Sequence, residues 1–186
     1  MSLIILSPPA SEPVSLDEMK AHLRVAHNDE DALIASLTVA ARQTVEARAG
    51  LALISQHWRL TLDTPPDEIF FLPLSPVASV DEISVINKSG DPEIIDVNLY
   101  EASAATIGRV RRAGIWPRSG VRVDGYRIDF TAGWPDASEV PAALKQAIKL
   151  LAAQFFETRE AAGPDRIYQI PGTVDALIAP FKQVRL

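Results

Sequence analysis

The chain contains three histidines, and histidine is the side chain that most often transfers protons or binds metal ions near neutral pH. They are His22, His27 and His57. A separation of five residues does not place His22 and His27 on one face of a helix, and no serine–histidine–carboxylate order is evident in the sequence. We therefore interpret them as surface or hydrogen-bonded side chains. No catalytic residue, no metal site and no enzymatic activity is predicted.

An acidic run is the second group that could do chemistry, because carboxylates are the preferred ligands of hard cations. It consists of Asp29, Glu30 and Asp31, directly before an apolar periodic segment. Negative charge is stabilising at the N-terminus of a helix, so we interpret the run as a helix start. The chain has no cysteine, which excludes thiolate metal sites, and its glycines in the segment 108–125 are spaced like turns rather than like a phosphate-binding loop. No cofactor is expected.

Two segments carry opposite charge. Residues 109–127 include six arginines and one acid, a net charge of five positive, and residues 12–31 include six acids and two bases, a net charge of four negative. One interpretation is two solvated faces. The other is an interface between copies of the chain, because a guanidinium group can bind a carboxylate with two parallel hydrogen bonds. The interface residues predicted on the second interpretation are Asp29, Glu30, Asp31, Arg109, Arg111 and Arg112.

The overall composition is that of an ordinary globular protein, with 47% hydrophobic and 23% charged residues among 186. The formal net charge of −6 argues against a general nucleic-acid binder. A small nucleic-acid-binding module that uses the Arg109–Arg127 segment is the alternative function. No apolar run approaches the length of a membrane span, and the one at residues 3–6 is too short for a signal peptide, so no membrane association is expected.

Helices are predicted over residues 15–24, 29–50 and 140–162. Each of the two long helices has an apolar stripe at helical spacing, and neither would be stable alone, which predicts that they pack together. The packing residues expected are Leu33, Leu37, Val45, Leu144, Ile148, Leu151 and Phe155.

The ends of the helices have recognisable signals. Ser15 and Glu18 have the spacing of a capping box, in which each side chain accepts a hydrogen bond from the other residue's amide. Asn28 or Asp29 is expected to cap the second helix, and Gly50 is expected to end it in a left-handed turn.

Between the long helices the period changes from helix to strand. Residues 54–62 alternate apolar and polar side chains, and further short strands separated by proline and glycine turns predict a small antiparallel β-rich segment over 53–132. The predicted fold class is therefore α+β, with an antiparallel helical core of two long helices plus the short N-terminal helix. The predicted organisation is an N-terminal arm at 1–13, a main domain at 14–167 and a C-terminal tail at 168–186.

The tail is more apolar than a solvated terminus requires, while Pro171 and Pro180 prevent a long helix. Two interpretations are open: the tail packs on its own domain, or it waits for a partner and becomes ordered on binding. The apolar residues concerned are Ile170, Val174, Leu177, Ile178 and Phe181.

Several motifs follow one another in a characteristic order. VSLDEMKAHLR at residues 14–24 leads into DEDALI at 29–34, QHWRL stands at 56–60, and FTAGW at 130–134 precedes VPAALKQAI at 140–148. In these motifs the chain resembles the head–tail connector (adaptor) family of tailed phages, prophages and gene transfer agents, over about residues 14 to 181. The motifs are structural signatures and none of them is catalytic.

This resemblance implies an assembly role: a ring, commonly of twelve copies, that lies below the portal and prolongs the DNA channel towards the tail. The partners implied are further copies of the chain, the portal protein, a tail-side connector or stopper protein, and DNA that passes without sequence recognition. The location implied is the bacterial cytoplasm during assembly and then the head–tail interface of the particle. The apolar tail residues would be the portal-docking element.

Overall fold

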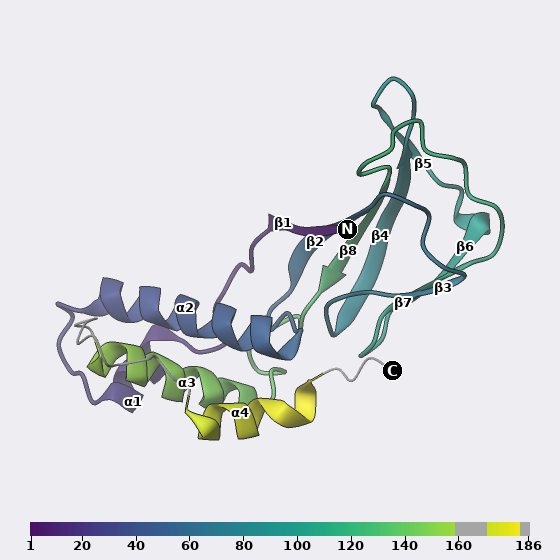
Figure 1. Cartoon of the computed structure of the whole chain (residues 1–186). Coiled ribbons are helices and arrows are strands. Elements are labelled where there is room, and N and C mark those ends of the chain that lie inside the picture. The colour runs from purple at the N-terminus through teal and green to yellow at the C-terminus, as the bar shows by residue number, and fades with distance from the viewer. Residues whose placement is uncertain (159–170, 183–186) are drawn as a thin grey trace. The chain divides into compact units, whose positions relative to one another are not determined.

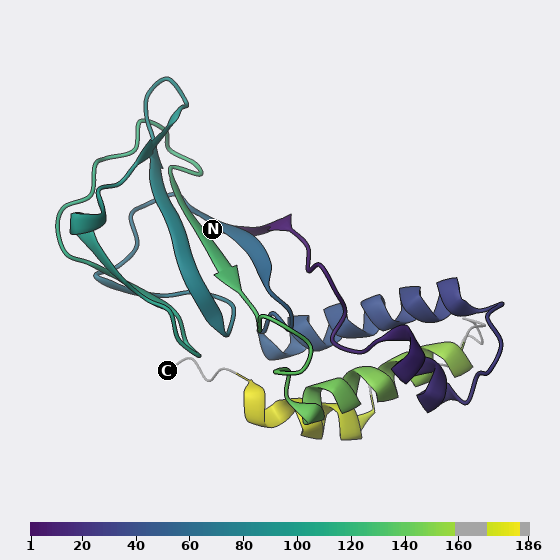
Figure 2. The same cartoon turned by 180° about the vertical axis from the view of Figure 1, so that it is seen from behind.

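A computed structural model describes residues 1–158 and 171–182 and divides the chain into two compact units (Figures 1 and 2). The β unit comprises Met1–Ala10 and Ile54–Trp134, and the helical unit comprises Ser11–Leu53 and Pro135–Leu186. Each unit is therefore built from segments that are far apart in the sequence.

The helical unit contains four α-helices among its described residues, and α2 and α3 are the long ones. Figure 1 shows α2 beside α3, and α4 packs on α3. The helices are α1 (Leu16–Leu23), α2 (Asp31–Ala49), α3 (Ala142–Glu157) and α4 (Gly172–Ile178), and a 3₁₀ turn, η2 (Ala179–Phe181), follows α4.

The capping box that the sequence predicts is present at the start of α1. The Glu18 amide donates to Ser15 Oγ at 3.2 Å, and the Ser15 amide donates to Glu18 Oε2 at 3.0 Å. The predicted cap of α2 is wrong: Glu30 occupies the cap position and makes no side-chain capping bond. Asn28 instead accepts a hydrogen bond from Lys20 Nζ at 2.6 Å, so its side chain links the two helices.

The buried face of α2 differs from the predicted stripe. Leu33 and Leu37 are only half-buried, while Ile34 and Thr38 are buried in their place. Two polar residues, Arg42 and Glu46, are buried on this face together with Ala49 and with Val45, which is buried as predicted. On α3, Leu144, Ile148 and Leu151 are fully buried as predicted, whereas Phe155 is half-buried.

The β unit contains two antiparallel sheets. Five strands follow the order β1-β2-β8-β4-β5, and three follow the order β3-β7-β6. The strands of the larger sheet are β1 (Ser2–Ser7), β2 (Gln56–Leu62), β4 (Val77–Ile86), β5 (Pro92–Ile94) and β8 (Tyr126–Ala132). Those of the smaller sheet are β3 (Ile69–Phe71), β6 (Tyr100–Ser103) and β7 (Arg109–Arg112), with a 3₁₀ turn, η1 (Val97–Leu99), before β6.

The central strand β8 shows why this segment folds as a sheet. Its residues Tyr126, Ile128, Phe130 and Ala132 are buried, and the residues between them are half-buried. On the other face Asp129 accepts hydrogen bonds at 2.7 and 2.6 Å from Arg59 on β2, a cross-strand ion pair that fixes the register. The α+β class with antiparallel sheets is confirmed. A single core built on two long helices is not supported, because the strands form a separate unit with its own buried side chains.

Candidate assembly surfaces

The acidic residues predicted for an interface lie at the turn from α1 to α2. Lys20 Nζ is 2.6 Å from Asp31 Oδ1, so this carboxylate already has a partner within the helical unit. Asp29 is the most open of the three, with its side chain 90% exposed and His27 Nδ1 at 3.6 Å. Glu30 is more covered and lies 3.9 Å from the same ring. Asp29 is therefore the carboxylate best placed to meet another molecule.

The predicted arginines lie on β7, the central strand of the smaller sheet. Arg109 and Arg111 are exposed, and Arg111 is flanked by Glu68 at 3.7 Å and Glu101 at 3.8 Å. Arg112 is half-buried, and its Nε has no hydrogen-bond partner among the described residues. The sequence presents the three as equivalent, but Arg109 and Arg111 are more exposed than Arg112.

The exposed face of the smaller sheet is hollowed. A cavity of about 450 Å³ lies over this face, between Glu68 and Ile69 on one side and Glu101 on the other, with Arg109 and Arg111 along its floor. Arg109 and Arg111 pair across the strands with Phe71 and Ile69. This face therefore mixes guanidinium groups with apolar side chains, as protein–protein interfaces do.

Residues 113–125 of the arginine-rich segment follow β7 as a loop that contains the buried Trp116, and Arg127 lies on β8. The Trp116 Nε1 donates to the Leu99 carbonyl at 3.0 Å, and its ring contacts Tyr100 and Tyr126. Trp116 is buried and packs within the β unit.

Exposed large apolar side chains are a feature that the sequence reasoning missed. Those recorded among the described residues all lie in the β unit. Three of them are consecutive on the edge strand β1, and two are on the edge strand β3. The run of uncharged residues over 2–7 was the available signal. They are Met1, Ile4, Ile5, Leu6, Ile69, Phe71, Ile94, Val97, Ile107, Ile115 and Val123.

The C-terminal residues predicted to dock on a partner are packed on the helical unit where the structure describes them. Val174 and Ile178 on α4 are fully buried, whereas Leu177 and Phe181 are half-buried. An ion pair holds α4 to α2, because both oxygens of Asp175 accept hydrogen bonds at 2.9 Å from Nη2 of Arg48. Ile170 lies outside the described residues.

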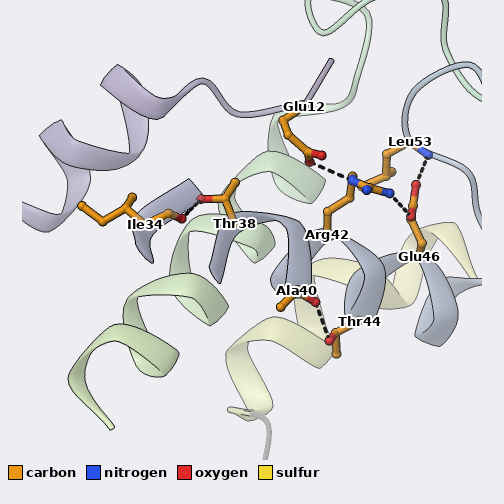
Figure 3. A network of polar contacts seen from close by, with 8 residues as sticks. All are labelled: Glu12, Ile34, Thr38, Ala40, Arg42, Thr44, Glu46 and Leu53. Atoms are coloured by element: carbon orange, nitrogen blue, oxygen red, sulfur yellow. Dashed lines mark hydrogen bonds and ion pairs between the residues drawn. The ribbon is translucent and has the colours of Figure 1, made fainter. Parts of the chain in front are cut away.

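A polar network connects Glu12, before α1, and Leu53, after α2, to the C-terminal half of α2 (Figure 3). Arg42 donates from Nε to Glu12 Oε2 at 2.7 Å and from Nη1 to Glu46 Oε2 at 2.6 Å. The other oxygen of Glu46 accepts from the Leu53 amide at 2.8 Å. Glu12 and Leu53 lie within two residues of the points where the chain passes between the two units. The network therefore binds the first and the last part of the segment 11–53 to α2.

Two further properties of the described residues bear on function. No group of three or more metal-binding side chains comes together in this part of the chain. None of the helices that the structure describes is both long enough and apolar enough to cross a membrane.

Comparisons with known proteins identify what the chain is similar to. A family model described as head completion protein matches residues 12–168. A solved neck of an empty gene transfer agent particle, computed with C6 symmetry, contains a chain that is 28% identical, with a TM-score of 0.84. A virion of a native gene transfer agent particle gives 30% identity and a TM-score of 0.82, and a native neck computed with C12 symmetry gives 29% and 0.81. Each match covers 100% of this chain and 97% of the other. The curated proteins give no match.

Proposed function

The chain belongs to the head completion protein family, and we propose that it is a structural component of the neck of a phage-like particle, at the junction of head and tail. The observation that carries the proposal is the agreement over the full chain with subunits of solved necks of gene transfer agent particles. The proposal is also supported by the surface of the smaller sheet, where guanidinium groups and exposed apolar side chains lie together as they do in protein–protein interfaces.

The finer proposal is that copies of the chain form a closed ring, of twelve in the particle, which prolongs a DNA channel between the portal and a tail-side connector or stopper protein. The sixfold and twelvefold symmetries of the related necks support a cyclic arrangement. Such a ring needs a heterologous contact, in which two different surfaces of the same chain meet. A net charge of −6 would leave a channel wall weakly adhesive to DNA.

The charge pattern supports one such contact. We propose that Asp29 of one copy faces Arg109 and Arg111 of the next copy, because these are the predicted interface residues that are most open to solvent. Glu30 and Asp31 follow Asp29 in the sequence, and Arg112 follows Arg111, so these less exposed residues would lie at the border of the contact. Exposed ion pairs contribute little affinity, and this contact would mainly set the orientation and the rate of docking.

Docking on the portal through the C-terminal tail remains a proposal in a narrower form. Val174 and Ile178 are fully buried on the helical unit, so the half-buried Leu177 and Phe181 are the described tail residues that a portal could contact without unfolding α4. Val174 and Ile178 would instead hold Leu177 and Phe181 in position.

Sedimentation of the purified chain with the portal protein of the same particle tests the function. We expect the chain to co-sediment with portal rings, and to bind 30-base-pair duplex DNA weakly if at all. Failure to bind the portal, together with DNA binding that falls steeply with salt concentration, would instead favour a nucleic-acid-binding module that uses the Arg109–Arg127 segment.

A further inference from the structure

The two sheets of the β unit have four edge strands, and only two of these edges are protected. An exposed strand edge invites pairing with another chain, and native proteins prevent this with proline or charged residues. The edge β5 contains Pro92 and Glu93, and the edge β6 contains Glu101. The edges β1, with the sequence SLIILS, and β3, with the sequence IFF, have neither.

The unprotected edges are also apolar. On β1 the side chains of Ile4 and Ile5 are 49% and 44% exposed. On β3 those of Ile69 and Phe71 are 51% and 54% exposed. Among the residues that the structure describes, β1 pairs with β2 alone and β3 pairs with β7 alone. Both strands therefore offer free backbone groups next to uncovered apolar surface.

The two edges lie on opposite sides of the β unit, as both views show (Figures 1 and 2). The strand order places β1 at one end of the larger sheet, and β4, three strands further along, is the strand that contacts the smaller sheet. The Val77 amide on β4 donates to the Ala105 carbonyl at 2.9 Å, next to β6 and β7.

We infer that β1 of one copy lies along β3 of the next copy. Two different surfaces on opposite sides of one unit are what a head-to-tail ring requires, whereas pairing of β1 with β1 would produce a twofold dimer that cannot propagate round a ring. The contact extends the smaller sheet beyond β3 and lies next to the face that carries Arg109 and Arg111, whose cross-strand partners are Phe71 and Ile69. This inference rests on the proposed function, because it names the surfaces through which the ring closes.

Crosslinking tests the contact directly, because the chain has no cysteine of its own. The double variant Ile4→Cys/Ile69→Cys, assembled on the portal and treated with a short bismaleimide, is expected to give a ladder of covalent oligomers. Each single variant is expected to stay monomeric on a denaturing gel. The matched control is Ile94→Cys/Ile115→Cys, whose native side chains are 70% and 93% exposed but lie outside the two edges, and it should give no ladder.

A charged residue on the edge provides a second, independent test. Ile4→Lys should abolish rings seen by electron microscopy, with the circular dichroism spectrum unchanged, while Ile94→Lys should leave them intact. Four results would each contradict the inference without contradicting the proposed function. In the crosslinking experiment they are rings without a ladder, dimers from Ile4→Cys alone, and an equal ladder from the control pair. In the second experiment it is the persistence of rings in Ile4→Lys. If the unmodified chain forms no ring on the portal, the proposed ring is contradicted, and so is the inference that depends on it.

Discussion

Arg42 on α2 is the centre of the buried polar network in the helical unit. It is 5% exposed and holds two carboxylates, one of them from Glu12, 30 positions earlier. Arg42→Ala should destabilise the helical unit by about 3–5 kcal/mol, because removing one partner of a buried ion pair leaves the other charges uncompensated. Urea unfolding followed by circular dichroism at a helix wavelength measures this loss.

Arg48 on the same helix is the matched control for that experiment. Its ion pair with Asp175 is roughly two-fifths exposed on both sides. Solvent screens such a pair, so Arg48→Ala should cost no more than about 1 kcal/mol. Equal losses in the two variants would mean that the network around Arg42 is not a buried one in solution.

The capping box of α1 makes the free energy of unfolding depend on pH in the acid range, through Glu18. The hydrogen bond from the Ser15 amide lowers the pKa of Glu18, and nearby Lys149 lowers it further. A carboxyl whose pKa is lower in the folded state stabilises the fold at pH values above its unfolded pKa. This stabilisation disappears as the pH falls through the folded pKa.

Glu18→Gln isolates this charge effect, since glutamine can still accept the amide hydrogen bond. Thermal melts from pH 7 to pH 3 should show the native chain more stable than the variant near neutrality, with the difference vanishing at the acid end. A difference that stays constant over the whole range would show that the charge has no part in it.

On the two long helices, two leucines that the sequence presents as equivalent differ in burial. Leu151 on α3 is fully buried, and Leu37 on α2 is half-buried. Leu151→Ala should therefore cost about 2–5 kcal/mol. Leu37→Ala should cost about 1 kcal/mol, a typical value for a point mutation. Denaturant midpoints that shift equally would contradict the packing of α2 described above.

The elements also show which features could be read from the sequence. Local signals were sufficient for the helix positions, the capping box at Ser15 and the alternation of β2, because each depends on neighbours within a few residues. The buried face of α2 could not be read this way. Arg42 and Glu46 look like surface residues until Glu12 and the Leu53 amide, brought from other parts of the chain, satisfy them.

The candidate surfaces were predictable only in part, for a similar reason. The charge of the β7 arginines is visible in the sequence, but their difference in exposure depends on strand pairing with β3 and β6. The exposure of Ile69 and Phe71 depends on the register of β3 with β7, which places them beside Arg111 and Arg109 on the open face of the smaller sheet. Apolar residues in a short strand are otherwise expected to be buried.

At the scale of the whole molecule, the proposed charge contact predicts a rescue. Arg109→Glu should reduce the fraction of chain in rings, and so should Asp29→Arg, because each places like charges opposite one another between copies. The double variant should partly restore assembly, as judged by sizing on the portal at low salt. A double variant no better than either single one would remove Asp29 and Arg109 from the interface.

The proposed function makes this chain a ring-forming component between head and tail. Cryo-electron microscopy of the chain bound to its portal tests this proposal. We expect a closed ring of twelve copies, coaxial with the portal, around an open channel. A chain that decorates the portal at scattered positions without closing a ring, or that never binds it, would contradict the account.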